Sequence, residues 1–253
     1  MNDILTSAAS VMNFSLGEKV IVQSALERNG VFRERCDLVS SPSEKGLILT
    51  DGTFLYPLGQ AEGKEMDAVS SHGILGTRTA VAALVQGKKE PRDRVIMDKD
   101  FSFLRSVPPD LPQLSAGISV ATITDESDLQ SLGRLRTQFL AEESGSELSD
   151  VEAHSGNIPD LQSVVLKKDG KAIGMINSDF FSKESAMISM LFIEKQHRGH
   201  GYGVLLLQQY VRLLLQRSAS VCLFYSPTNT SAKKLYERMG FMKEEDWMMV
   251  LPH

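Results

Sequence analysis

Residues 196–203 form a glycine-rich turn with the sequence Gln196-His197-Arg198-Gly199-His200-Gly201-Tyr202-Gly203. The apolar residues 187–193 precede the turn and are typical of a strand, and residues 204–216 follow it with the pattern of a helix. Glycine allows positive φ and lets the backbone approach a ligand closely. The unpaired N–H groups of a first helical turn, aided by the helix dipole, favour an anion at that position. This arrangement predicts a binding site for a diphosphate.

The spacing of the turn excludes two common nucleotide motifs. A dinucleotide fingerprint has G-x-G-x-x-G directly after a strand, with an acidic residue about 20 residues later. A phosphate loop has G-x-x-x-x-G-K-[ST]. Neither pattern occurs here, because the order from Gln196 to Gly201 is Q-x-x-G-x-G.

A second informative segment follows a predicted buried strand at residues 221–225. From Asn229 to Phe241 the sequence has the form N-x-x-A-x-x-L-Y-x-x-x-G-F. Asn229 or Thr228 is expected to cap a helix over residues 231–239. Gly240 is expected to end that helix in the left-handed conformation.

The two patterns, in this order and separation, resemble the two halves of the acyl-CoA site of the GNAT N-acetyltransferase superfamily. The resemblance covers about residues 118–253 and says little about residues 1–112. It implies an α/β fold with a mixed, highly twisted sheet and helices on both faces. It also implies that the strand before the turn and the strand at 221–225 run parallel and part at one end, so that acetyl-CoA joins the sheet there.

The resemblance also implies roles for particular residues. Acetyl-CoA (coenzyme A) is expected to contact Leu191, Phe192, Ile193, Arg198, Gly199, His200, Gly201, Tyr202, Gly203, Asn229 and Tyr236. Tyr236 is the expected acid that protonates the leaving thiolate, and the alternative is a half-buried aromatic with a structural role. An attacking amine must lose a proton, so the reaction also needs a base.

The sequence leaves the base open among four carboxylates, each of which is otherwise a solvated surface charge. The candidates are Glu142, Glu143, Glu184 and Glu194, and Glu143 is our choice because it ends the predicted helix 126–142, which borders the acceptor pocket in related enzymes. The acidic segment 142–152 either attracts a cationic amine or is a hydrophilic loop. No metal-ligand spacing is found among His154, His197 and His200, so no metal is expected.

Composition limits the remaining function classes. The 253 residues carry a net charge of −5, and both halves are negative, which argues against a nucleic-acid partner. No apolar run is long enough to span a bilayer, and the N-terminal residues lack the blocks of a signal peptide. Two cysteines, Cys36 and Cys222, lie in different halves, and Cys222 is expected to be a buried apolar residue. We therefore expect a cytoplasmic protein, with a homodimer left open.

Three prolines within residues 108–112 predict a break between domains. We expect an N-terminal α/β domain at residues 1–112, a linker at 113–117 and a GNAT domain at 118–253. In the N-terminal part we expect a hairpin around Asp51-Gly52, a strand at 67–70, a glycine turn at 73–76, a helix at 77–86 and a strand at 94–98. This order favours a degenerate GNAT-like repeat, and the alternative is an unrelated α+β module.

The leading functional hypothesis is an acetyl-CoA-dependent N-acetyltransferase that acts on a primary amine of a small molecule or peptide by direct attack. The alternative is a CoA-binding sensor or regulatory protein without turnover. Tyr236 favours the enzyme, and the absence of an obvious base favours the sensor.

Overall fold

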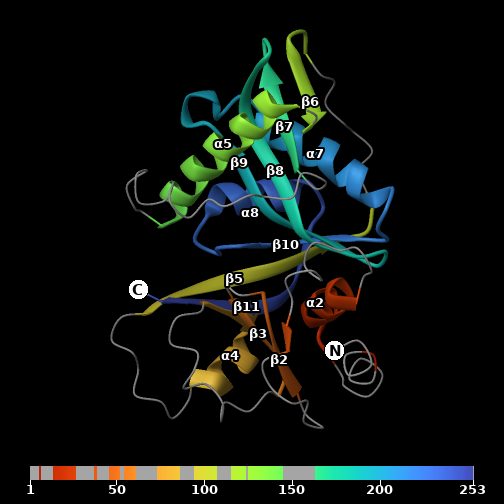
Figure 1. Cartoon of the computed structure of the whole chain (residues 1–253), viewed down its shortest axis with the longest axis vertical. Coiled ribbons are helices and arrows are strands. Elements are labelled where there is room, and N and C mark those ends of the chain that lie inside the picture. The colour runs from red at the N-terminus through yellow and green to blue at the C-terminus, as the bar shows by residue number, and fades with distance from the viewer. Residues whose placement is uncertain are drawn as a thin grey trace.

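The structure, a computed structural model, describes residues 6, 14–26, 37–38, 46–51, 54–60, 73–85, 94–106, 115–123, 125–144 and 163–252. Within these residues two lobes share one sheet, whose middle strands cross between the lobes (Figure 1). The helices are α2 (Leu16–Leu26), α4 (Arg78–Val85), α5 (Glu126–Ser144), α7 (Tyr202–Leu215) and α8 (Thr230–Arg238), with a 3₁₀ turn η3 (Lys195–His197).

The described strands form an 11-stranded mixed sheet with the order β1-β2-β3-β4-β11-β5-β10-β9-β8-β7-β6. They are β1 (Asp37–Leu38), β2 (Gly46–Thr50), β3 (Phe54–Gly59), β4 (Gly73–Thr77), β5 (Arg94–Leu104), β6 (Ile118–Thr122), β7 (Ser163–Lys168), β8 (Lys171–Phe181), β9 (Ala186–Ile193), β10 (Val221–Tyr225) and β11 (Met242–Pro252). We refer to β6–β10 with α5, α7 and α8 as the C-terminal lobe, and to β1–β4 with α2 and α4 as the N-terminal lobe.

The two lobes exchange a strand. β5 comes from the N-terminal part of the chain but pairs with β10 of the C-terminal lobe. β11 ends the chain but pairs with β4 of the N-terminal lobe. β5 and β11 pair with each other between the lobes, in antiparallel register from Met242–Phe103 to Pro252–Arg94. Each lobe therefore depends on a strand from the other part of the sequence.

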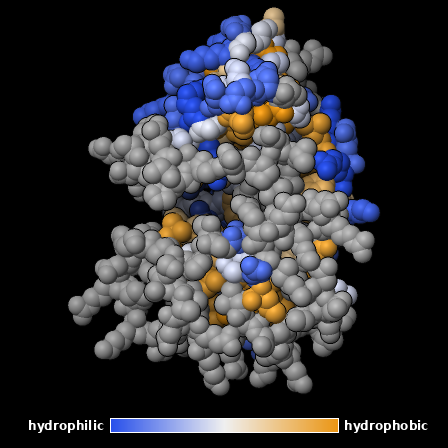
Figure 2. Space-filling view, viewed as in Figure 1, coloured by the Kyte–Doolittle hydropathy of each residue, from blue (hydrophilic) through white to orange (hydrophobic). Residues whose placement is uncertain are grey.

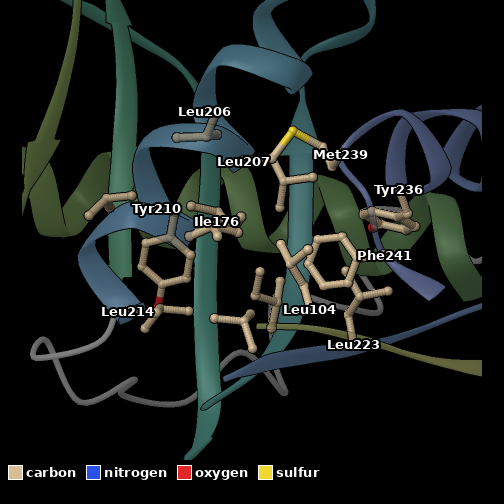
Figure 3. Close-up of a cluster of buried hydrophobic side chains, with 14 of the residues drawn as sticks. Leu104, Ile176, Leu206, Leu207, Tyr210, Leu214, Leu223, Tyr236, Met239 and Phe241 are labelled. Atoms are coloured by element: carbon tan, nitrogen blue, oxygen red, sulfur yellow. The ribbon is translucent and has the colours of Figure 1, made fainter. Parts of the chain in front are cut away.

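The faces of the sheet are covered by different helices. On one face, α5 and α2 pack over side chains such as Phe192 and Trp247. On the other face, α7 and α8 pack over Ile193, Leu223 and Tyr225 (Figure 3). Because side chains alternate along a strand, the adjacent residues Phe192 and Ile193 lie on opposite faces.

The predicted parting of the strands is present in the pairing. β9 and β10 run parallel and are paired only from Ala186–Val221 to Ile188–Leu223. Beyond Ile188, β9 continues to Ile193 paired with β8 alone. The register between β8 and β9 shifts at the same point, where it skips Ser189. A bulge thus lies where β10 leaves β9, and strand edges face the gap that opens beyond it.

Most predicted elements of the C-terminal lobe are confirmed within a few residues of their expected bounds. Strands β9 and β10 cover the expected residues, and α7 and α8 begin and end within two residues of the expected bounds, whereas α5 runs on from the expected end at residue 142 to Ser144. The acidic segment after Ser144, the strand at 67–70 and the proline-rich break at 108–112 lie outside the described residues. The division of the chain at 113–117 stays a prediction, and the strand exchange means that the lobes do not coincide with continuous segments.

The prediction of a glycine turn at residues 73–76 was wrong, since these residues form strand β4. The glycines serve close packing between strands. A Cβ on Gly73 would lie 2.5 Å from the Phe54 ring, and one on Gly76 would lie 2.9 Å from Pro57 Cγ. Glycine is found in strand interiors where another chain segment approaches this closely.

The two lobes repeat one order of elements: a parallel strand pair, a helix and then the exchanged strand. In the N-terminal lobe these are β3–β4, α4 and β5, and in the C-terminal lobe they are β9–β10, α8 and β11. However, only residues 60–72 connect β3 with β4, which is shorter than α7 alone with its 14 residues. This connection is shorter than a glycine loop followed by a helix of that length, and no turn equivalent to residues 196–203 is found in the described residues of the N-terminal lobe.

Candidate functional site

The glycine turn is built to expose backbone N–H groups. Gly199 and Gly201 have φ of 81° and 80°, in the left-handed region, and Gly201 is the N-cap of α7. A Cβ added at either glycine would meet no atom within 4 Å, so the space before the helix is open. Among the described residues, none accepts a hydrogen bond from the backbone N–H groups of residues 199–204. These donors are available to an anion at the N-terminus of a 14-residue helix.

A buried carboxylate fixes the start of this turn. Glu194 is 4% exposed, and its carboxylate pairs with the Arg134 guanidinium from α5 and accepts a hydrogen bond from Gln196 at 3.0 Å. Arg134 also donates to the Ala172 carbonyl oxygen at 2.8 Å. The first residue of the Q-x-x-G-x-G pattern thus holds the turn by a side-chain contact within the protein.

Arg198 turns its side chain away from the open space before α7. Its Nε donates to the Ile193 carbonyl oxygen at 2.8 Å, and its guanidinium lies 5.3 Å from the centre of the Phe192 ring. The guanidinium also binds the Glu142 carboxylate at 2.7 Å, at the end of α5. The Arg198 N–H donates to the Lys195 carbonyl oxygen. Arg198 therefore links the turn to α5, and its guanidinium is bound by groups of the protein.

The open edge of β9 provides further backbone groups. The Glu194 N–H donates to Ile173 on β8 at 2.9 Å. Because alternate residues of a strand direct their backbone groups to opposite sides, Phe192 faces β8, whereas Leu191 and Ile193 face the gap. Of the three strand residues predicted to contact the pantetheine arm, two therefore present their amides on the side where β10 has moved away.

Local structure fixes the position of Tyr236. Asn229 caps α8, since its Oδ1 accepts from the Ala232 N–H at 3.0 Å, as predicted. The helix ends at Gly240 with φ of 87°, where the Gly240 N–H donates to Glu237 and the Phe241 N–H donates to Tyr236. This is the Schellman arrangement, which usually includes an apolar contact across the helix end. Here that contact joins the rings of Tyr236 and Phe241, 5.9 Å apart (Figure 3).

The Tyr236 hydroxyl is suited to remain protonated. Burial raises the pKa of Tyr236 above its usual value, and the charge of Glu143 and the neighbouring Tyr225 raise it further. The hydroxyl has no hydrogen-bond partner in the described part of the chain. Tyr236 lies in α8 on one face of the sheet, and Glu143 lies in α5, which covers the other face. The effect of the Glu143 charge on the Tyr236 pKa shows that the two predicted catalytic residues lie near each other.

The structure separates the four candidate bases. Glu194 and Glu142 are occupied by arginines, as described above. Glu184 lies in the turn before β9, at the opposite end of that strand from the glycine loop. Glu143 is half exposed, and its nearest ionic partner is Lys99 at 4.0 Å. Of the four candidates, Glu143 is the one whose charge contributes to the raised pKa of Tyr236, and no arginine binds its carboxylate in the described part of the chain.

The analysis of the sequence missed Lys99, which β5 contributes from the N-terminal part of the chain. Its side chain is only 10% exposed and lies beside Glu143. No spacing in the sequence indicates this neighbour, because the strand exchange brings it there. Figure 2 shows hydrophilic residues where the two lobes meet, on the face that is in view.

Other reactive groups give no alternative site. Burial raises the pKa of the Cys222 thiol to about 12, so this residue is a buried, unreactive thiol, as expected. Among the described residues, no group of three or more metal-ligating side chains is placed to hold an ion. No helix within the described ranges is both long enough and apolar enough to cross a membrane.

Residues 129–241 match the model of the acetyltransferase (GNAT) family, and this part of the chain therefore belongs to that family. The match includes both the glycine turn and the helix that carries Tyr236. It supports acetyl transfer as the general activity. Comparison with curated proteins gives no match.

Solved structures show the fold over nearly the whole chain. A GCN5-related N-acetyltransferase-like protein from Streptococcus suis has a TM-score of 0.66 and 12% identity, with 100% of each chain covered. A GCN5-related N-acetyltransferase from Kribbella flavida has a TM-score of 0.62 and 13% identity, covering 94% of this chain and 96% of that one. A tandem GNAT protein from the clavulanic acid biosynthesis pathway has a TM-score of 0.58 and 16% identity, covering 99% and 93%.

Proposed function

We propose that this protein is an acetyl-CoA-dependent N-acetyltransferase that acetylates a primary amine of a small molecule or peptide by direct attack. One observation carries the proposal. The strands β9 and β10 part next to a turn with unpaired N–H groups, and Tyr236 and Glu143 lie near each other on helices that cover opposite faces of the sheet.

The chain's groups fit the parts of acetyl-CoA. The N–H groups of Gly199, His200, Gly201, Tyr202 and Gly203 suit the diphosphate. The amides of Leu191 and Ile193 suit the pantetheine arm, which would take the place of a strand. Three of the predicted contact residues support the site indirectly. Phe192 pairs with β8, Arg198 donates a hydrogen bond to the Ile193 carbonyl oxygen, and Asn229 caps the helix that carries Tyr236.

In the proposed reaction acetyl-CoA supplies an activated acetyl group as a thioester. The amine nitrogen forms the new C–N bond as the C–S bond breaks, and two protons must move. Glu143 takes the proton that the nitrogen loses, directly or through a water molecule. Tyr236 gives its proton to the departing sulfur. A strand N–H at the gap is placed to stabilise negative charge on the thioester oxygen.

Three further parts of the hypothesis stay predictions: a cytoplasmic location, a homodimer as an alternative to a monomer, and a degenerate GNAT-like origin of the N-terminal lobe. The last is supported by the repeated order of elements.

The proposal is tested by free-thiol release from acetyl-CoA with a panel of primary amines, alongside calorimetric titration with coenzyme A. We expect binding, and thiol release that depends on the amine. Binding without turnover on any amine would favour the sensor. Absence of binding would contradict both readings.

A matched pair of variants tests the proposed diphosphate site in the glycine turn. Gly201→Ala forces a side chain into the left-handed region at the proposed diphosphate site, and we expect coenzyme A affinity to fall about tenfold, which is ~1.4 kcal/mol. Gly170→Ala is the control, because Gly170 has φ of 81° and equally open surroundings but lies in the β7–β8 turn. Equal losses in the two variants would show that the effect is on folding.

A further inference from the structure

Lys99 is a mostly buried cation beside Glu143, the proposed base. It lies on β5 opposite Trp247 of β11, on the same face as Phe101. Its side chain is 10% exposed, and Glu143 Oε2 lies 4.0 Å from Nζ. Within the described residues Glu143 is its only ionic partner, and no hydrogen bond of its ammonium group is found there.

The neighbours of Lys99 on β5 form ion pairs whose N–O distances are those of hydrogen bonds. Asp98 binds Arg78 at 2.7 Å, and Asp100 binds Lys243 at 2.9 Å. Lys243 is also bound by Asp246 at 2.7 Å. These pairs are short and lie on the opposite side of the strand from Lys99, because side chains alternate.

By comparison, the contact between Lys99 Nζ and the Glu143 carboxylate is too long for a hydrogen bond. An ammonium group has three donors, and burial of a charge is costly unless it is hydrogen-bonded. A distance of 4.0 Å leaves those donors unsatisfied by Glu143. The ammonium group therefore has donors left for a further anionic group.

Lys99 and Glu143 together present a positive and a negative group to the same space. In an α-amino acid the nitrogen and the carboxylate oxygens are about 3 Å apart, as the N–Cα and Cα–C bond lengths require. An amino group facing Glu143 would thus bring its own carboxylate to Lys99. We propose that the acceptor is an amino-acid-like amine whose carboxylate is bound by Lys99. This inference rests on the proposed function and narrows its acceptor class.

The test compares amines that differ only in the carboxylate. The values of kcat/KM are measured for several α-amino acids and for the corresponding decarboxylated amines. The wild-type protein is expected to favour the amino acids. Lys99→Gln removes the charge and keeps most of the stem, so the preference should fall about 100-fold through loss on the amino acids alone. The ratio of the two kcat/KM values does not depend on how much of the variant is folded.

Two further variants give the controls. Lys99→Arg keeps the cation and should keep a preference for the carboxylate. Lys243→Gln removes a lysine whose ammonium is already filled by Asp100 and Asp246, and it should leave the preference unchanged. Equal loss on both acceptor classes in Lys99→Gln would make Lys99 a structural residue and overturn the inference.

The inference also fails if the wild-type protein acetylates the decarboxylated amines as well as the amino acids. In that case the proposed function still stands. By contrast, failure to bind coenzyme A would remove the proposed function itself, so the two failures are distinguishable.

Discussion

At the scale of single residues, several features of the structure fix the position and the protonation of Tyr236. The helix end fixes its backbone, Phe241 and Tyr225 fix its ring, and burial keeps its hydroxyl protonated. Because the pKa is raised above the usual value of 10.0, the hydroxyl remains a proton donor at every pH below that value. The proposed acid is therefore not lost as the pH rises through the range in which the amine becomes a nucleophile.

The first prediction concerns this hydroxyl. Tyr236→Phe should lower kcat about 100-fold, the usual contribution of a general acid, while coenzyme A affinity changes less than about twofold. Stability should change little, since the hydroxyl has no partner among the described residues. Steady-state kinetics and calorimetry measure the two effects. Tyr210→Phe, in the same buried cluster, is the control and should keep kcat. An unchanged kcat in Tyr236→Phe would remove the acid role.

The residue scale also shows that a sequence motif does not specify the direction of a long side chain. Arg198 belongs to the recognised pattern, and its charge suits a phosphate. In the structure the same guanidinium binds Glu142 and the Ile193 carbonyl oxygen. A sequence pattern identifies a position in the turn, but only the packing around it decides where a long side chain points.

At the scale of elements, the helix α8 depends on its two ends. Asn229 caps the N-terminus, and Gly240 closes the C-terminus in the left-handed conformation. A Cβ at Gly240 would lie 3.5 Å from Leu104, which is an ordinary contact. The cost of a side chain there is therefore conformational and not steric.

This gives a second prediction with a matched control. Gly240→Ala should lower the free energy of unfolding by about 1 kcal/mol, because a side chain is strained at positive φ. Gly133→Ala lies in the middle of α5 with no atom within 4 Å of the new Cβ, and it should raise the stability by about 0.5–1 kcal/mol. Urea unfolding measures both changes. The same sign for the two variants would contradict the argument.

Elements of the C-terminal lobe were predictable because their signals are local. Apolar periodicity gives the strand and helix on either side of the glycine turn, and the cap residues give the ends of α8. The strand β4 was missed because its two glycines suggest a turn. Their actual role, the close approach of Phe54 and Pro57 from β3, is a tertiary contact that no local pattern contains.

At the scale of the whole molecule, the exchange of β5 and β11 joins the lobes. Glu245 on β11 shows how: its carboxylate accepts hydrogen bonds from the Leu16 N–H at 2.6 Å and from Ser15 Oγ at 3.0 Å, at the start of α2. It also accepts from Trp247 Nε1 at 2.8 Å. The end of the chain thus caps the first described helix, where the helix dipole favours a carboxylate.

The third prediction is that the two lobes unfold together. Trp247, the one tryptophan of the sequence, is fully buried in β11, so its fluorescence reports the junction between the lobes. Far-ultraviolet circular dichroism reports the helices, and most helical residues in the described part of the chain lie in the C-terminal lobe. The two unfolding curves should coincide, because neither lobe keeps its sheet without the exchanged strand. Two separate transitions would show that the lobes are independent.

The same junction can be weakened at one residue. Glu245→Gln should lower the common midpoint and reduce the free energy of unfolding by about 2 kcal/mol, since the bonds it loses are made to a charged group. Glu244→Gln, at the neighbouring exposed position, should change it by less than about 0.5 kcal/mol.

The sequence by itself determined the glycine turn, the strand and helix around it, the helix that carries Tyr236 and the kind of fold, because each depends on residues close together in the chain. Only the tertiary structure decided which strands pair across the lobes, which carboxylate lies near Tyr236 and which lysine lies beside that carboxylate. Those contacts join β5, α5 and α8, which are far apart in the sequence. No local pattern encodes them, since they arise when β5 is inserted between β10 and β11.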